Sequence, residues 1–160
     1  MRLLRHLLTP HWLALRAFPS GALRKIEAAI KASEHLHAGE LRFAVESSLP
    51  FSFLNLNTRK RAEALFAQLG VWDTAHNSGV LIYVQLIDRR IEIVADRGIS
   101  ARVEQSEWSA VCREMEQAFK RGQHADGALQ AIGAITRLLA THFPPGARNP
   151  NELPDRPVVL

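Results

Sequence analysis

The sequence predicts an α/β fold with the element order α-β-α-β-β-α-α, and three observations support this. Residues 79–96 hold two β-branched, apolar runs around the charged turn Asp88-Arg89-Arg90, as expected for a β-hairpin. Residues 40–47 alternate apolar and polar side chains, as one strand with two different faces would. Four further stretches carry apolar residues at helical spacing, and one of them lies between the first strand and the hairpin.

Composition limits the chain to one domain and excludes two kinds of site. The chain has 160 residues, of which 47% are hydrophobic, so it can bury a core of its own. Its single cysteine, Cys112, excludes an internal disulfide and a thiolate metal centre, and its place on an apolar helical stripe indicates a core position. No run reaches the roughly 20 apolar residues that span a bilayer. We therefore expect a cytoplasmic protein, with membrane association as an alternative.

The basic charge is concentrated in the first part of the chain. Residues 1–61 hold ten Lys and Arg against four Asp and Glu, within a formal net charge of +4 for the whole chain. Residues 1–18 form a basic, loosely amphipathic segment interrupted at Pro10. This segment packs on the body, binds a partner, or lies on a membrane surface. Its likeness to a signal peptide is broken by His6, Pro10 and His11, so we expect it to be retained.

The first half of the body contains two predicted helices and one strand. A helix starts at Pro19-Ser20, with Ser20 as its cap, and runs to about His35. The strand Glu40–Ser47 follows, and then a loop that contains two Phe residues. Asn57 or Thr58 caps a second helix, which ends at Gly70.

The second half contains the hairpin and two more predicted helices. A turn-rich connector, residues 71–79, leads into the hairpin. Ser106 caps a third helix that Gly122 closes, and a fourth helix starts near Asp126. Residues 144–160 contain five prolines and no strand or helix periodicity. They form an extended tail that is either disordered or laid over the surface.

Strand direction predicts which acidic residues meet. Two strands joined through a helix are almost always parallel, and a hairpin returns its second strand to the edge where its first strand began. Glu40, Asp73, Asn77 and Asp96 should therefore converge at one edge of the sheet, whereas Glu46 and Asp88 should lie at the opposite end.

Oxygen ligands of this type suit calcium or magnesium rather than zinc. A bound divalent ion there could hold a phosphate and activate water, with Asp96 or Glu40 taking the proton. The alternative is structural: Asp73 and Asn77 cap turns, Asp96 caps the loop at Gly98, and Glu40 pairs with an arginine such as Arg97.

Several stretches together resemble the TPM domain family. The stretches that carry this resemblance, over about residues 20–143, are 39–41, 61–66, 77–82, 89–99, 119–122 and 126–127. The resemblance implies a three-layer α/β/α sandwich with a short mixed sheet, and it makes residues 19–143 a TPM-like domain between the segment 1–18 and the tail 144–160. Many members are bacterial; some are described as acid phosphatases, and some bind calcium near acidic loops over the sheet. Many also carry a signal peptide and a C-terminal membrane helix, neither of which we expect here.

Two functions follow as hypotheses. The first is a TPM-domain protein with a calcium site at Glu40, Asp73, Asn77 and Asp96 that hydrolyses phosphomonoesters of small molecules or proteins. The alternative is a non-catalytic interaction module, which docks on a membrane-associated or protein partner through the N-terminal segment and the tail. The three tryptophans are scattered rather than grouped as a base-stacking platform, so we expect no nucleic-acid partner.

Overall fold

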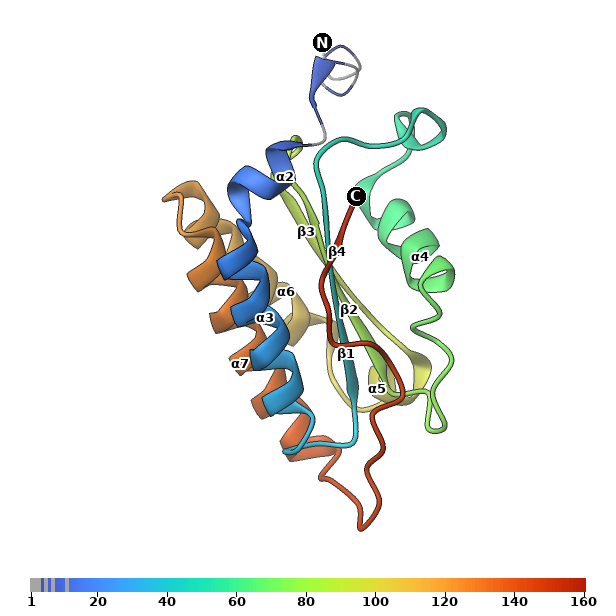
Figure 1. Cartoon of the computed structure of the whole chain (residues 1–160). Coiled ribbons are helices and arrows are strands. Elements are labelled where there is room, and N and C mark those ends of the chain that lie inside the picture. Colours follow the sequence, from blue (N-terminus) through green and yellow to red (C-terminus); the bar gives the residue numbers. More distant parts are fainter. Residues whose placement is uncertain (1–3, 5, 7, 11) are drawn as a thin grey trace.

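The computed structural model describes residues 4, 6, 8–10 and 12–160, and its centre is a mixed sheet (Figure 1). The strand order is β3-β2-β1-β4. β1 runs parallel to both β2 and β4, whereas β2 and β3 form the predicted antiparallel hairpin. The strands are β1 (Glu40–Glu46), β2 (Gly79–Gln85), β3 (Arg90–Ala95) and β4 (Val158–Val159).

The parallel direction of β1 and β2 confirms the step on which the site prediction depends. The chain leaves β1, passes through α4 (Thr58–Gln68) and returns to start β2 directly beside the start of β1. Glu40 is paired with Gly79, and Ala95, at the end of β3, is paired with Val80. The beginnings of β1 and β2 and the end of β3 therefore share one edge of the sheet.

Helices cover both faces of the sheet, which confirms the three-layer arrangement. One face packs on α3 (Ser20–Ser33), α6 (Gln105–Lys120) and α7 (His124–His142), while α4 lies on the other face (Figure 1). Alternate strand residues divide accordingly: Phe43 and Ile82 belong to the core under the three helices, and Ala44 and Leu81 belong to the smaller core under α4. The shorter elements are α2 (Trp12–Ala17), η1 (Phe51–Phe53) and α5 (Arg97–Ser100).

The helix caps agree with the sequence in one case and differ in two. Asn57 caps α4, because its side chain accepts from the Lys60 N–H at 2.9 Å. The prediction of Ser106 as a cap is wrong, since the cap is Glu104, two residues earlier, which forms a capping box with Glu107. The prediction of Ser20 is also wrong, because it is already the first helical residue of α3.

The proline-rich tail is laid against the sheet rather than disordered. The Leu160 N–H donates to the Val45 carbonyl at 2.8 Å, and the Ser47 N–H donates back to the Leu160 carbonyl at 3.2 Å. These bonds add β4 to the free edge of β1, and Leu153 is buried in the core under α4. The tail is therefore part of the folded domain.

The N-terminal segment is described only in part, since residues 1–3, 5, 7 and 11 of the predicted stretch 1–18 lie outside the described residues. Within the described part of the chain, no helix combines the length and the hydropathy that crossing a bilayer requires.

Candidate functional site

The predicted edge exists, and two of its carboxylates flank one glycine. The Glu40 N–H donates to the Ser78 carbonyl at 3.0 Å, and the Asp96 N–H donates to the Gly79 carbonyl at 2.8 Å. Glu40, Gly79 and Asp96 thus form one row across three strands. Neighbours in such a row project to the same face of the sheet, which here is the face that α4 covers.

Val71 fills the space between these two carboxylates. A methyl group on Gly79 would lie 1.9 Å from the Val71 carbonyl oxygen, so the backbone of the connector rests directly on the glycine. Val71 itself is completely buried. Glu40 and Asp96 therefore share an edge, but the chain that leads into β2 lies between their side chains.

The carboxylate of Glu40 is held by the tail. Its Oε2 accepts from the Leu153 N–H at 3.1 Å, and only 3% of the residue is exposed. Burial raises the pKa of Glu40, although the amides of Leu153 and Glu152 act in the opposite direction. This contact replaces the Arg97 pairing that we considered as the structural alternative.

Asp96 keeps one oxygen without a partner. Its Oδ1 accepts from the Arg97 N–H at 2.7 Å and caps α5, a short helix that the sequence did not reveal. Its Oδ2 is buried, and no described residue donates a hydrogen bond to it. An unpaired buried carboxylate oxygen is costly, so this atom is the place at the edge where a ligand or a water molecule would be most favourable.

The connector residues lie against the first turn of α5. The Gly98 N–H donates to the Asn77 carbonyl at 3.1 Å, and a methyl group on Gly98 would lie 2.5 Å from the His76 carbonyl oxygen. Asn77 adopts a left-handed conformation with φ of 52°. Asp73, earlier in the same connector, is exposed. Asn77 and Asp96 therefore belong to one compact corner.

This corner fits calcium in part. Among the residues that the structure describes, no three His, Cys, Asp or Glu side chains are grouped so that they could hold a metal ion. A site here would use the carboxylate of Asp96, completed by the Asn77 side chain, main-chain oxygens and water. Asp73 lies earlier in the connector and is exposed, and its side chain makes no described contact with this corner. Calcium accepts such mixed oxygen sets. Glu40 does not fit while the tail holds its carboxylate.

His37, three residues before Glu40, has a structural role. His37 is fully buried, and its Nδ1 accepts from the Gly39 N–H at 3.2 Å. Burial lowers the pKa of His37 to about 4, so the ring is neutral at pH 7. Its main-chain carbonyl accepts from the Asn149 side chain of the tail.

The tail crosses the edge through several polar contacts that the sequence did not predict. The Arg42 guanidinium donates to the carbonyls of Pro154 and Arg156, and Glu152 accepts from the Ala75 N–H at 2.8 Å. Partners more than 70 residues apart make these contacts, so no local pattern could have indicated them. A buried arginine on a strand, such as Arg42, was the available signal that something polar covers this face.

Glu34 is a proton-binding group beneath the same tail. Its Oε1 accepts from the Leu41 N–H at 3.2 Å. Burial and the negative charge of Glu40 raise the pKa of Glu34 to about 8. Glu34 is therefore mostly protonated at pH 7 in the folded protein, whereas its usual pKa of 4.5 makes it ionised in the unfolded chain.

Stability should therefore fall between pH 7 and pH 9. The folded state binds one more proton than the unfolded state over the range from 4.5 to about 8, so its stability declines as pH rises. One pH unit of this range corresponds to about 1.4 kcal/mol. We expect the free energy of unfolding of the wild-type protein, measured in urea, to be lower at pH 9 than at pH 7 by roughly this amount. The same difference should be small in Glu34→Gln. Equal losses in both proteins would contradict the assignment.

A buried ionic cluster occupies the opposite end of the face under α4. Arg61 donates to Glu46 through Nε at 3.0 Å and through Nη2 at 2.6 Å, and the Tyr83 hydroxyl donates to the same carboxylate at 2.6 Å. Burial opposes the charge of Arg61, but the contacts with Glu46 outweigh it and raise the arginine pKa. All three groups have partners, so the cluster joins α4 to the sheet and needs no ligand.

Comparison with known proteins decides the family. A family model described as the TPM domain matches residues 17–138. The chain belongs to the TPM domain family. This confirms the resemblance seen in the sequence. The comparison with curated proteins gives no match.

Two solved structures share the fold of this TPM domain. The BA42 protein from the psychrophilic bacterium Bizionia argentinensis is 27% identical with a TM-score of 0.79, over 88% of this chain and 94% of that one. The N-terminal domain of a P. gingivalis protein is 18% identical with a TM-score of 0.65, over 84% of this chain and 90% of that one. The likeness to the second structure concerns the fold alone.

Proposed function

We propose that this TPM domain binds a divalent cation, with calcium preferred, at the corner where Asn77 meets Asp96, with the exposed Asp73 of the same connector as a further ligand. The observation that carries the proposal is the buried, unpartnered Oδ2 of Asp96 beside the connector. Oxygen donors without thiolate or imidazole select hard cations. Glu40 contributes to the charge of this edge but is not a ligand in this arrangement, because the Leu153 amide occupies it.

Phosphomonoester hydrolysis is the more specific form of this proposal. A bound divalent cation would supply charge that stabilises a phosphoryl group and its attacking water. Of the two residues predicted as catalytic, Asp96 has a free oxygen, whereas Glu40 is shielded by the tail. Since Oδ1 of Asp96 caps α5 and Oδ2 would bind the cation, Asp96 would act by holding the ion. Glu40 could accept the proton from water only after the tail had moved.

Calorimetric titration with calcium tests the site. We expect Asp96→Asn to weaken binding by about tenfold or more, and Asp73→Asn to weaken it by several-fold, because each removes a charged ligand. Glu40→Gln should change the affinity little, and Asp126→Asn, in the first turn of α7, serves as the matched control for loss of one negative charge.

The titration can also fail clearly. Calcium affinity that is unchanged in Asp96→Asn would contradict the proposal. A large loss of calcium affinity in Glu40→Gln would instead support the four-ligand site predicted from the sequence. Hydrolysis of p-nitrophenyl phosphate that disappears in Asp96→Asn would support catalysis, while activity that survives would assign it to a contaminant or another site.

Attachment to an anionic membrane surface is the second candidate. Leu4, Leu8, Trp12 and Leu15 follow one another at helical spacing, and between 48% and 74% of each is exposed. The basic charge of residues 1–61 is complementary to such a surface. Replacing the exposed Leu4, Leu8 and Trp12 by serine should abolish sedimentation with phosphatidylglycerol vesicles, and retained sedimentation would exclude this candidate.

A further inference from the structure

A cavity lies at the end of the sheet opposite to the candidate cation corner. Its volume is about 400 Å³, which falls within the usual size of small-molecule sites, about 300–1,000 Å³. It is enclosed by α2, the turn between β2 and β3, the end of α6 and the first residue of α7. The function proposed for the cation corner makes no use of this cavity.

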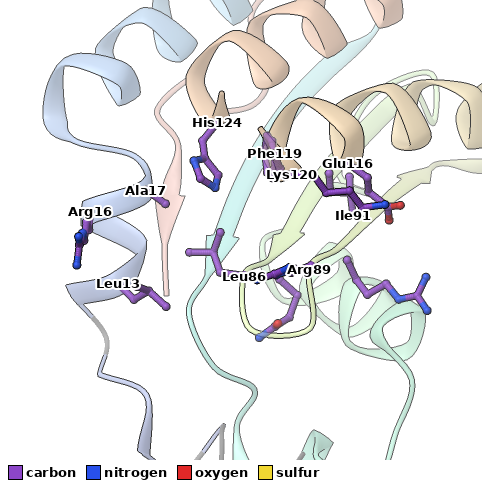
Figure 2. A pocket seen from close by; sticks show the side chains of 12 residues that line it. Leu13, Arg16, Ala17, Leu86, Arg89, Ile91, Glu116, Phe119, Lys120 and His124 are labelled. Atoms are coloured by element: carbon purple, nitrogen blue, oxygen red, sulfur yellow. The ribbon is translucent and has the colours of Figure 1, made fainter. Parts of the chain in front are cut away.

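The interior of the cavity is apolar. Leu86, at the end of β2, and Phe119, on α6, contribute to its wall. Figure 2 shows Leu13 and Ala17 of α2 on one side of the opening, with His124 projecting from the start of α7 toward Leu86. A ligand that fills this space must therefore present apolar surface to it.

The charged residues around the cavity are predominantly basic. Arg16, Arg89, Arg90 and Lys120 line it, against a single acidic residue, Glu116. In the part of the chain that the structure describes, no carboxylate forms an ion pair with any of these four basic side chains. Arg90 is the most compensated of them, since it acts electrostatically on Glu92. Arg89 and Lys120 are exposed.

An apolar cavity with a predominantly basic rim favours a ligand that combines an apolar part with an anionic group. An uncharged apolar molecule would leave the basic groups unused, and inorganic phosphate alone would leave the interior unfilled. Guanidinium groups suit phosphate because their donors form a planar fork. We propose that this cavity binds a phosphate monoester that carries a short apolar chain, with the phosphate at Arg89 and Lys120 and the chain against Leu86 and Phe119.

Calorimetric titration of the full-length protein with hexyl phosphate tests the proposal, with inorganic phosphate, 1-hexanol and hexanoate as partial ligands. We expect hexyl phosphate to bind at least about tenfold more tightly than inorganic phosphate or 1-hexanol, because only the ester uses both parts of the cavity. Hexanoate separates phosphate recognition from general anion recognition. If hexanoate binds as tightly as hexyl phosphate, the phosphate assignment is overturned.

Variants locate the binding. Arg89→Ala and Lys120→Ala should each weaken hexyl phosphate binding by about fivefold or more, since each removes a charge-assisted contact. Arg113→Ala, an exposed basic residue of α6 outside the cavity, is the matched control. Binding that is unchanged in both cavity variants, or equally weakened in the control, would overturn the proposal. Asp96→Asn should leave hexyl phosphate binding intact, so the proposal for this cavity and the proposal for the cation corner can be disproved separately.

Two sources could supply such a ligand, a soluble phosphoester or a phospholipid head group. Sedimentation with phosphatidylglycerol vesicles distinguishes them. Loss of vesicle binding in Arg89→Ala and Lys120→Ala would assign the cavity to a lipid head group, whereas vesicle binding unaffected by either variant, together with binding of hexyl phosphate, would assign it to a soluble ester.

Discussion

Replacing Arg61 by alanine is expected to lower the free energy of unfolding by about 3–5 kcal/mol, because the change leaves a buried carboxylate without its counter-ion. The side chains of Arg61 and Glu46 are only 8% and 3% exposed. Without Arg61, the Glu46 carboxylate keeps the Tyr83 hydroxyl as its one side-chain partner among the described residues, and Phe53 loses the guanidinium that lies 4.8 Å from its ring centre. Urea unfolding at pH 7 measures the effect.

Lys60→Ala is the matched control for this prediction. Lys60 precedes Arg61 in α4 and pairs with Glu63 at 3.0 Å, but its side chain is 63% exposed. Exposed pairs of this kind contribute about 0–1 kcal/mol. The double variant Glu46→Ala with Arg61→Ala should be less destabilised than the sum of the two single variants, since neither charge is then left alone. Comparable losses in Lys60→Ala and Arg61→Ala would contradict the role given to the cluster.

Gly79→Ala is expected to destabilise the domain by about 3 kcal/mol or more and to weaken calcium binding at the same time. The added methyl group would meet the Val71 carbonyl oxygen, which belongs to buried backbone and cannot rotate away. The connector must then shift, and this connector carries Asp73 and Asn77. Thermal unfolding and calcium titration of the same variant measure both effects.

Gly133→Ala is the opposite case and serves as the control. Gly133 lies inside α7, and the nearest heavy atom to an added methyl group there is the end of the Arg137 side chain at 3.7 Å. Alanine in a helix interior is favoured over glycine by roughly 0.5–1 kcal/mol, so this variant should be slightly more stable than wild type. A Gly79→Ala protein as stable as wild type would show that the connector does not rest on β2 as described.

The sheet was predictable because its rules are local or topological. The apolar run from Val80 to Leu86 predicts a strand that is covered on both faces, and residues 80–85 are buried. The helical crossover between Glu40 and Gly79 fixes the parallel direction, and the hairpin then brings Asp96 to the same edge. Each of these inferences uses only periodicity, turn residues and the handedness of connections.

The surroundings of the edge were not predictable from such rules. Glu40 is shielded by Leu153, a residue 113 positions away in a proline-rich stretch without periodicity. Val71 occupies the gap between Glu40 and Asp96 because Gly79 has no side chain. This contact follows from how the chain packs in three dimensions, and no sequence pattern indicates it. The pairing of Glu46 with Arg61 is similar: Arg61 stands among core-facing positions of α4, and that unusual placement was the one available signal.

The central claim is that a divalent cation binds at the corner of Asp73, Asn77 and Asp96, and amide chemical shifts recorded during a calcium titration test it most directly. The account predicts saturable shifts confined to residues 73–79 and 96–99, with the far end of the sheet around Leu86 unchanged. Shifts that are absent, or that instead map to the basic cavity, would contradict it.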